Sequence, residues 1–197
     1  MNLPNKITIS RIILSVIVLI LLLFPFNEFG ITFPIIVVKD ALLVDIKYVV
    51  AGTLFLIASV TDFLDGYIAR KNNIVTDFGK MLDAIADKML VNGVLIVLAC
   101  NGFISVIIPV VIVIRDIAVD TIKMVVGNKK AAVAASPLGK IKTILMMCGV
   151  TLMLYYNLPF ELMNFRLADI LIILATIMSV VSGVEYYIKN KNIIIEN

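Results

Sequence analysis

Four aspartates occur as two closely spaced pairs within otherwise apolar sequence, and they are the residues best suited to chemistry. Asp62 and Asp65 are three residues apart, and Asp83 and Asp87 are four apart. Residues at these spacings share one face of a helix, so each pair presents two carboxylates in one direction. A charge at the centre of a membrane helix costs at least about 2.5–3.5 kcal/mol, so such residues are rare and usually functional.

The two pairs can meet because only residues 71–77 separate the helices expected to carry them. This short connection makes the two helices antiparallel neighbours and places all four carboxylates near one end. Converging carboxylates repel one another, whereas two divalent cations would balance their charge. Hard oxygen ligands suit Mg²⁺, Mn²⁺ or Ca²⁺, and a two-metal site is a common device for phosphoryl displacement. The spacing therefore predicts a metal site formed by Asp62, Asp65, Asp83 and Asp87.

The elements that must position these residues are apolar stretches long enough to span a bilayer. The chain has 197 residues, 61% hydrophobic and 16% charged, with a mean hydropathy of +1.09. A soluble domain has about 45–50% apolar residues, and a small core cannot hide the excess. About 20 helical residues cross the hydrocarbon layer. We expect an all-α, polytopic membrane protein of six transmembrane helices, over residues 7–29, 46–70, 78–98, 103–126, 139–156 and 167–188.

Lysine and arginine are distributed unevenly between the two ends of these segments. One side carries only Lys39, Lys47 and Arg166, and the other holds the remaining basic residues of the termini and connections. Because cytoplasmic loops carry the excess of positive charge, both the N- and C-termini should be cytoplasmic. The net charge of +3 mostly reflects this bias, so we infer no nucleic-acid partner. Without repeats or composition shifts, residues 1–197 should form a single domain.

Residues 62–87 also carry the signature of a known family. The pattern resembles that of the CDP-alcohol phosphatidyltransferases, D-x2-D-G-x2-A-R-x8-G-x3-D-x3-D, at every fixed position. Those positions are filled by Asp62, Asp65, Gly66, Ala69, Arg70, Gly79, Asp83 and Asp87. A complete match at this spacing is far more specific than a lone pair of acids.

The resemblance continues outside this signature. The start of the chain is similar to a second element, N-x-x-T-x-x-R, with Asn5, Thr8 and Arg11 at its fixed positions. Arg115 and residues 136–143 resemble segments of the members that use glycerol 3-phosphate. Asp116 stands where Glu is usual, and residues 120–123 replace a small-residue run that ends in Arg. These departures lie where the acceptor is expected to bind, so they leave the acceptor open.

The resemblance implies a reaction and a set of partners. The donor would be CDP-diacylglycerol, the acceptor sn-glycerol 3-phosphate, and the surroundings membrane lipids. Two divalent cations, Mg²⁺ or Mn²⁺, would be held by the four aspartates. Asp87 would also act as the general base for the acceptor hydroxyl, which requires hydrogen-bond reach. Family members are homodimers, and we expect the same here, in the cell membrane with the active site facing the cytoplasm.

Binding residues follow from the same resemblance. CDP-diacylglycerol would be bound by Gly66, Ala69, Arg70, Asn5 and Thr8. The phosphate of the acceptor needs cationic partners, because it is an anion near the membrane edge. Arginine binds phosphate oxygens in a fork and lysine binds them as a point charge. The candidates for this acceptor-phosphate site are Arg115, Lys140 and Lys142.

Other interpretations of the acidic residues stay open. The same chemistry could serve another acceptor, such as inositol phosphate, phosphatidylglycerol or serine. A cation transporter with an acidic intramembrane site would need discontinuous helices or a polar pathway, and the outer halves of these segments are apolar. A structural ion-pair network between helices is the third alternative.

Overall fold

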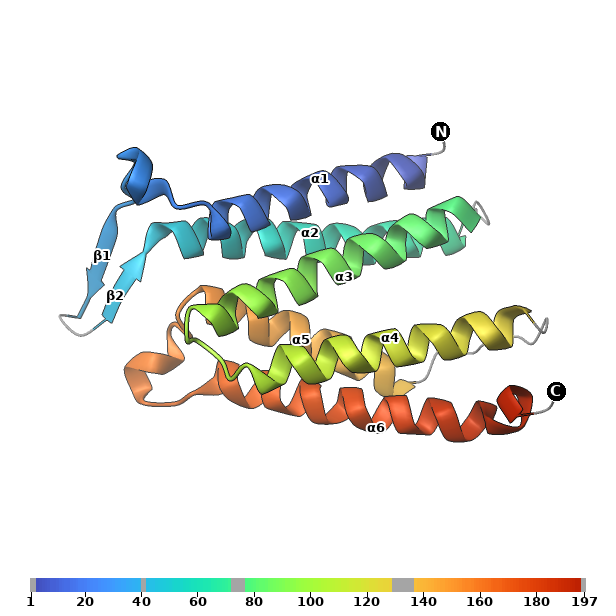
Figure 1. The fold of residues 1–197 in the computed structure, drawn as a ribbon. Helices are drawn as coiled ribbons and strands as arrows, with labels where there is room; N and C mark the ends of the chain where they lie inside the picture. Colours follow the sequence, from blue (N-terminus) through green and yellow to red (C-terminus); the bar gives the residue numbers. More distant parts are fainter. Residues whose placement is uncertain (1–2, 40–41, 72–76, 129–136, 196–197) are drawn as a thin grey trace.

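The computed structural model describes residues 3–39, 42–71, 77–128 and 137–195, without the side chains of residues 3–6, 63–71, 77, 78, 80, 128, 194 and 195. Within these ranges six α-helices run side by side in one bundle (Figure 1). Each of the six apolar segments expected to be helical forms a helix. Their bounds are α1 (Leu3–Leu23), α2 (Ile46–Lys71), α3 (Asp77–Cys100), α4 (Ile107–Asn128), α5 (Pro137–Leu154) and α6 (Leu167–Ile195).

The first helix is shorter than the apolar pattern indicates. It ends at Leu23, whereas the pattern favours residues 7–29. Pro25 has no amide hydrogen to continue the helical ladder, and it disfavours the helical conformation at Phe24. A short 3₁₀ helix, η1 (Phe26–Phe29), follows. A second one, η2 (Phe160–Met163), connects α5 to α6.

A β-hairpin follows η1, and the all-α prediction does not include it. Strands β1 (Ile35–Val38) and β2 (Leu42–Asp45) pair antiparallel, with Ile35 opposite Asp45. β1 consists entirely of isoleucine and valine, which favour strands because their branched side chains suit a pleated surface. The hairpin lies at the end of the bundle opposite the two termini (Figure 1). The all-α class therefore describes the bundle but needs correction for this segment.

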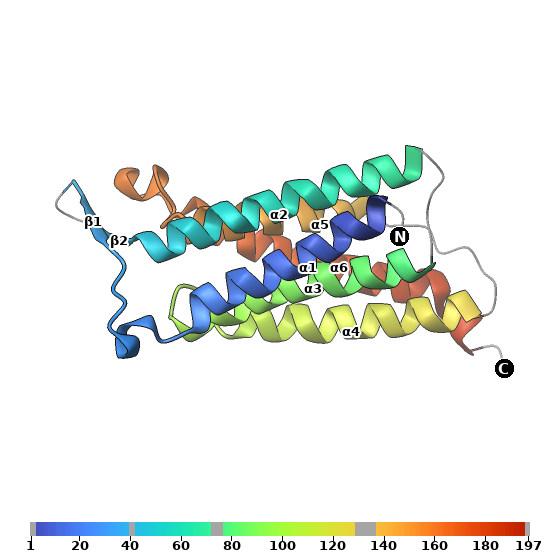
Figure 2. The same cartoon turned by 90° about the horizontal axis from the view of Figure 1, so that it is seen from above.

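Helix α1 lies between α2 and α3 and packs against both (Figure 2). We expected α2 and α3 to be direct neighbours because their connection is short. They do run antiparallel, but α1 is the neighbour that they share. The remaining packing joins α6 to α4 and α5, α5 to α2, and α3 to α4. This placement of α1 decides how the acidic residues meet.

The bundle core is apolar and close-packed, and α5 and α6 approach each other at a glycine. A Cβ added to Gly149 would lie 2.7 Å from Cγ1 of Ile172 and 3.1 Å from its backbone nitrogen. Small residues at a crossing allow two helix backbones to come close. The largest fully buried side chains of the core include Phe55, Leu95, Leu98, Ile112, Met146 and Leu154.

The outer surface of the bundle is also apolar. Ile107, Ile114 and Ile144 are each more than 60% exposed, which suits a surface in contact with lipid. Among the described helices, Pro137–Leu154 and Leu167–Ile193 are long and apolar enough to cross a membrane. The other helices carry charged residues within their apolar sequence, among them Arg11 of α1, Asp62 of α2 and Arg115 of α4.

Candidate active site

The C-terminal half of α2 and the N-terminal half of α3 lie towards the end of the bundle where α1 begins and α6 ends (Figure 1). Asp62 lies in the C-terminal half of α2, and Asp83 and Asp87 lie in the N-terminal half of α3. Antiparallel α2 and α3 bring these halves to the same end. Asp62, Asp83 and Asp87 thus lie towards the same end of the bundle, and their role as metal ligands stays a prediction.

Asp62 and Asp83 meet at an arginine of α1. Nη1 of Arg11 pairs with Oδ1 of Asp62, and Nη2 pairs with Oδ1 of Asp83. Nη2 also lies 3.5 Å from the backbone oxygen of Asp83. The Arg11 side chain is only 2% exposed. Arg11 is therefore a buried cation, and its two partner carboxylates come from different helices.

Sequence reasoning did not assign Arg11 to the site. The sequence pattern assigned Arg11 to the N-terminal N-x-x-T-x-x-R element and to the basic residues on one side of the membrane. The available signal was its position well inside an apolar segment, since a buried charge of that kind requires a partner. What the sequence could not supply was the location of α1 between the two acidic helices.

Asp87 lies one helical turn beyond Asp83 and lines a separate small cavity. The cavity has a volume of about 20 Å³, and its polar lining includes Lys88, Asp116 and Lys142. A space of this size holds about one water molecule. Asp87 thus faces the region between α3, α4 and α5, where Lys142, one of the predicted acceptor residues, also lies.

Asp116 is the centre of a charged network on the far side of this cavity. Its Oδ1 accepts hydrogen bonds from Nη1 of Arg115 and from Nζ of Lys142, each at 3.0 Å. The Asp116 and Lys142 side chains are both 13% exposed. Asp116 therefore holds the ammonium of Lys142 beside the Asp87 cavity.

Arg115 is engaged by helix α6. Its Nε donates to the backbone oxygen of Ser179 at 2.9 Å, and its Nη2 donates to Oγ of Ser182 at 2.7 Å. A Cβ at Gly183 would lie 3.2 Å from Cγ of Arg115, so the glycine makes room for this side chain. All three guanidinium nitrogens thus have protein partners, and Arg115 links α4 to α6.

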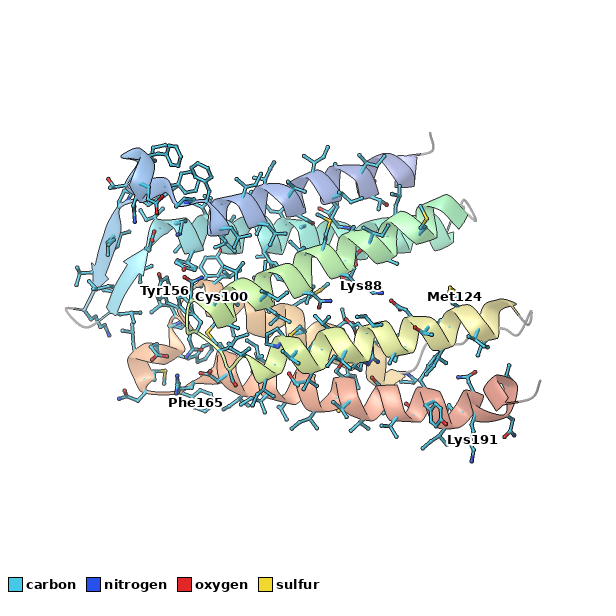
Figure 3. The ribbon with its side chains drawn as sticks, viewed as in Figure 1. Lys88, Cys100, Met124, Tyr156, Phe165 and Lys191 are labelled. Atoms are coloured by element: carbon cyan, nitrogen blue, oxygen red, sulfur yellow. The ribbon has the colours of Figure 1, made fainter. Side chains whose placement is uncertain are left out.

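Lys88 and Asp120 form another ion pair, between α3 and α4. Figure 3 shows Lys88 in the space between these helices, and its Nζ pairs with Oδ2 of Asp120. Lys123 lies 3.9 Å from the other carboxylate oxygen of Asp120. Asp120 and Lys123 are three residues apart on one helix face, whereas the contact with Lys88 depends on how the two helices pack.

The remaining predicted residues are placed with less detail. Thr8 is buried in α1 at 3% exposure, and Lys140 lies exposed in the first turns of α5. An open groove of about 310 Å³ lies between α1 and α2, and Ser10, Arg11 and Thr61 supply its polar lining. The side chains of the other predicted residues lie outside the described residues: Asn5, Asp65, Gly66, Ala69 and Arg70.

The donors at this end fit a divalent cation in chemistry. Asp62 and Asp83 offer hard carboxylate oxygens, and a single guanidinium already contacts both. The described residues alone contain no group of three or more acidic or cysteine side chains placed to hold one metal ion. Asp65, the fourth predicted ligand, is not part of that description. Two carboxylates from two helices that share one buried cation form the described core of the predicted site.

Most of the chain is similar to proteins of a known family. Residues 1–181 match the CDP-alcohol phosphatidyltransferase family, so the chain belongs to this family and is a transferase. Members of the family generally use divalent cations. Together with the apolar helices, membership also makes the chain a membrane protein.

Three relatives are named CDP-diacylglycerol–glycerol-3-phosphate 3-phosphatidyltransferase. The protein of Bacillus subtilis is 43% identical over 96% of this chain and 95% of its own length. That of Rickettsia bellii is 35% identical over 94% and 93%. That of Mycoplasma genitalium is 38% identical over 76% of this chain and 63% of its own length.

Proposed function

We propose that this chain transfers the phosphatidyl group of CDP-diacylglycerol to sn-glycerol 3-phosphate and releases CMP. The observation that carries the proposal is the 43% identity, over nearly the whole chain, to a relative named for this reaction. The acidic end of the bundle supports it, because Asp62, Asp83 and Asp87 lie where the family signature requires metal ligands and a base.

The cofactors of the proposed reaction are two divalent cations, Mg²⁺ or Mn²⁺. Asp62, Asp65, Asp83 and Asp87 would hold them, and oxygen ligands of this kind suit hard ions. When bound, such cations neutralise the charge of the pyrophosphate and make CMP a better leaving group. The pairing of Asp62 and Asp83 with one buried guanidinium supports a cation site between α2 and α3.

Asp87 is the proposed general base. Its carboxylate would take the proton of the acceptor hydroxyl as that oxygen bonds to the β-phosphorus of the donor. The bond between the β-phosphorus and the bridging oxygen breaks, and CMP leaves with that oxygen. Asp87 suits the role because it lines a small polar cavity that also contains Lys142. A base must lie within hydrogen-bond reach of the proton that it removes.

The acceptor phosphate is proposed to bind at Lys140 and Lys142, with Arg115 in support. Lys142 lies beside Asp87 and presents a positive charge to the same cavity. The three guanidinium nitrogens of Arg115 already donate hydrogen bonds to Ser179, Ser182 and Asp116. Its proposed contribution is therefore to fix Asp116, which in turn orients Lys142.

The donor is proposed to bind on the α1–α2 side of the site. The groove between α1 and α2 opens beside Arg11 and Thr61, and α2 carries the signature residues assigned to the nucleotide. Thr8, buried one turn before Arg11, belongs to the same helix face. The full set proposed to bind CDP-diacylglycerol is Asn5, Thr8, Gly66, Ala69 and Arg70.

The membrane arrangement is part of the proposal. Six transmembrane helices with cytoplasmic N- and C-termini would form a single domain over residues 1–197. The starts of α1 and α3 and the ends of α2 and α6 share one end of the bundle (Figure 1), which agrees with the positive charge on one side. The active site would face the cytoplasm of the cell, and the protein would be a homodimer.

The test is CMP release from CDP-diacylglycerol by purified protein in detergent, with each acceptor in turn. We expect release with sn-glycerol 3-phosphate, none without an acceptor, and none after EDTA. Faster release with inositol phosphate, serine or phosphatidylglycerol would reassign the acceptor. Cation flux in liposomes without any CMP release would contradict the proposed reaction and would indicate a cation transporter.

A further inference from the structure

Arg11 is a buried cation with no role in the proposed reaction. It is 2% exposed and lies on the face of α1 that packs against α2 and α3. A guanidinium remains charged in a protein, and burying a charge without a partner is strongly unfavourable. The partners of Arg11 are Asp62 and Asp83, two of the four proposed metal ligands.

Arg11 uses its fork to join two helices. One terminal nitrogen pairs with Asp62 of α2, and the other pairs with Asp83 of α3. A planar guanidinium suits this geometry, whereas a single ammonium presents one point charge. Without such a cation the two carboxylates would repel each other across the bundle.

The same oxygen atoms would serve a divalent cation. Each carboxylate commits its Oδ1 to the guanidinium, and a metal beside the guanidinium would also be repelled by its charge. A doubly charged ion about 5 Å from a singly charged group loses about tenfold in affinity even at the dielectric constant of water. Arg11 and the metal therefore compete.

Arg11 has room to change partners. It lines the groove of about 310 Å³ between α1 and α2, so the side chain has open space beside its ion pairs. Within the described part of the chain, its buried Nε has no hydrogen-bond partner. A guanidinium that is fully fixed by a structural network would have its donors satisfied.

We propose that Arg11 is the counter-ion that a divalent cation displaces from Asp62 and Asp83. It positions the two carboxylates between α2 and α3 before metal binds, and its charge lowers the affinity of the site for metal. This inference rests on the proposed metal site, and its test measures metal binding and stability rather than turnover.

The experiment titrates Mn²⁺ into EDTA-treated, purified protein and follows the free ion by electron paramagnetic resonance. Arg11→Met should bind Mn²⁺ about tenfold more tightly than the unaltered protein. Its melting temperature in EDTA should be lower, and the rise on adding Mn²⁺ should be larger. Arg166→Met is the control, because Arg166 is 75% exposed and pairs with Asp169 in the first turn of α6.

Two further variants separate the ways in which this inference could fail. If the Asp83→Asn variant has the same Mn²⁺ affinity as the unaltered protein, both the metal site and the role of Arg11 are overturned. If Asp83→Asn binds Mn²⁺ more weakly but Arg11→Met binds it no more tightly than the unaltered protein, only the role of Arg11 is overturned. If Arg11→Met does not fold, Arg11→Lys decides, because one ammonium cannot pair with both carboxylates as a fork does. An unchanged melting temperature of Arg11→Lys in EDTA would overturn the inference.

Discussion

Nζ of Lys142 donates a hydrogen bond of 3.0 Å to Oδ1 of Asp116, which joins α5 to α4 beside the cavity that Asp87 lines. The same carboxylate oxygen accepts from Arg115, which is fixed in turn by α6. A lysine held in this way presents its charge at a defined position. The relationship places a cation for the acceptor phosphate next to the proposed base.

Lys142→Ala should raise the KM for sn-glycerol 3-phosphate with little effect on the KM for CDP-diacylglycerol. A hydrogen bond to a charged group contributes about 1.5–3 kcal/mol, so the rise should be about ten- to a hundredfold. Lys191→Ala is the matched control, since Lys191 is an exposed lysine of α6 at the same end of the molecule (Figure 3). Steady-state kinetics with each substrate varied in turn measures both constants. Equal changes in the two KM values would argue against an acceptor-phosphate pocket at Lys142.

Arg115→Ala should lower the thermal stability of the protein as well as acceptor binding. The change leaves Asp116 with one partner fewer and removes the link to Ser179 and Ser182, for a loss of about 2–3 kcal/mol. Lys142→Ala should unfold at a temperature much closer to that of the unaltered protein. Thermal denaturation in detergent compares the two variants. A stable Arg115→Ala protein with a raised acceptor KM would instead favour direct contact between Arg115 and the phosphate.

Asp87→Asn should abolish turnover while largely sparing CDP-diacylglycerol binding. The amide has nearly the shape of the carboxylate but cannot accept the acceptor proton, and loss of a general base lowers kcat by about 10²–10⁴-fold. Binding of the donor is measured separately, by equilibrium titration of the variant. Full activity of Asp87→Asn would remove this residue from the role of base.

Gly149→Ala should destabilise the bundle because its Cβ would lie 2.7 Å from Cγ1 of Ile172 and 3.1 Å from its backbone nitrogen. Overpacking of this kind costs about 1–3 kcal/mol. Gly127→Ala is the control, since a Cβ there meets no atom within 4 Å among the described residues, and the change should stay within about 1 kcal/mol. A comparison of the two melting temperatures checks the close approach of α5 and α6. Equal melting temperatures would mean that the two helices are farther apart.

The sequence predicted the helices and the acidic end because both depend on local patterns. Apolar runs of sufficient length mark the segments, and Asp62, Asp83 and Asp87 follow from spacing on a helix face. The hairpin was missed because a run as short as Ile35–Val38 is ambiguous between strand and irregular structure. The end of α1 was overestimated because apolar composition continues past Pro25.

The partners of the charged residues could not be predicted in the same way. Arg11 lies 72 positions from Asp83, and their contact depends on the packing of α1 between two other helices. The pairing of Lys88 with Asp120 likewise requires the α3–α4 interface. Local spacing identifies which residues share a face, but the facing helix decides which charges meet.

The most direct test of the central claim uses sn-glycerol 3-phosphate that carries ¹⁸O in its C1 hydroxyl, with CDP-diacylglycerol and Mg²⁺. Mass spectrometry of the products should find the label in phosphatidylglycerophosphate and none in CMP, because the acceptor oxygen bonds to the β-phosphorus and CMP keeps the bridging oxygen. Label in CMP, or no labelled lipid from an active preparation, would contradict the proposed transfer.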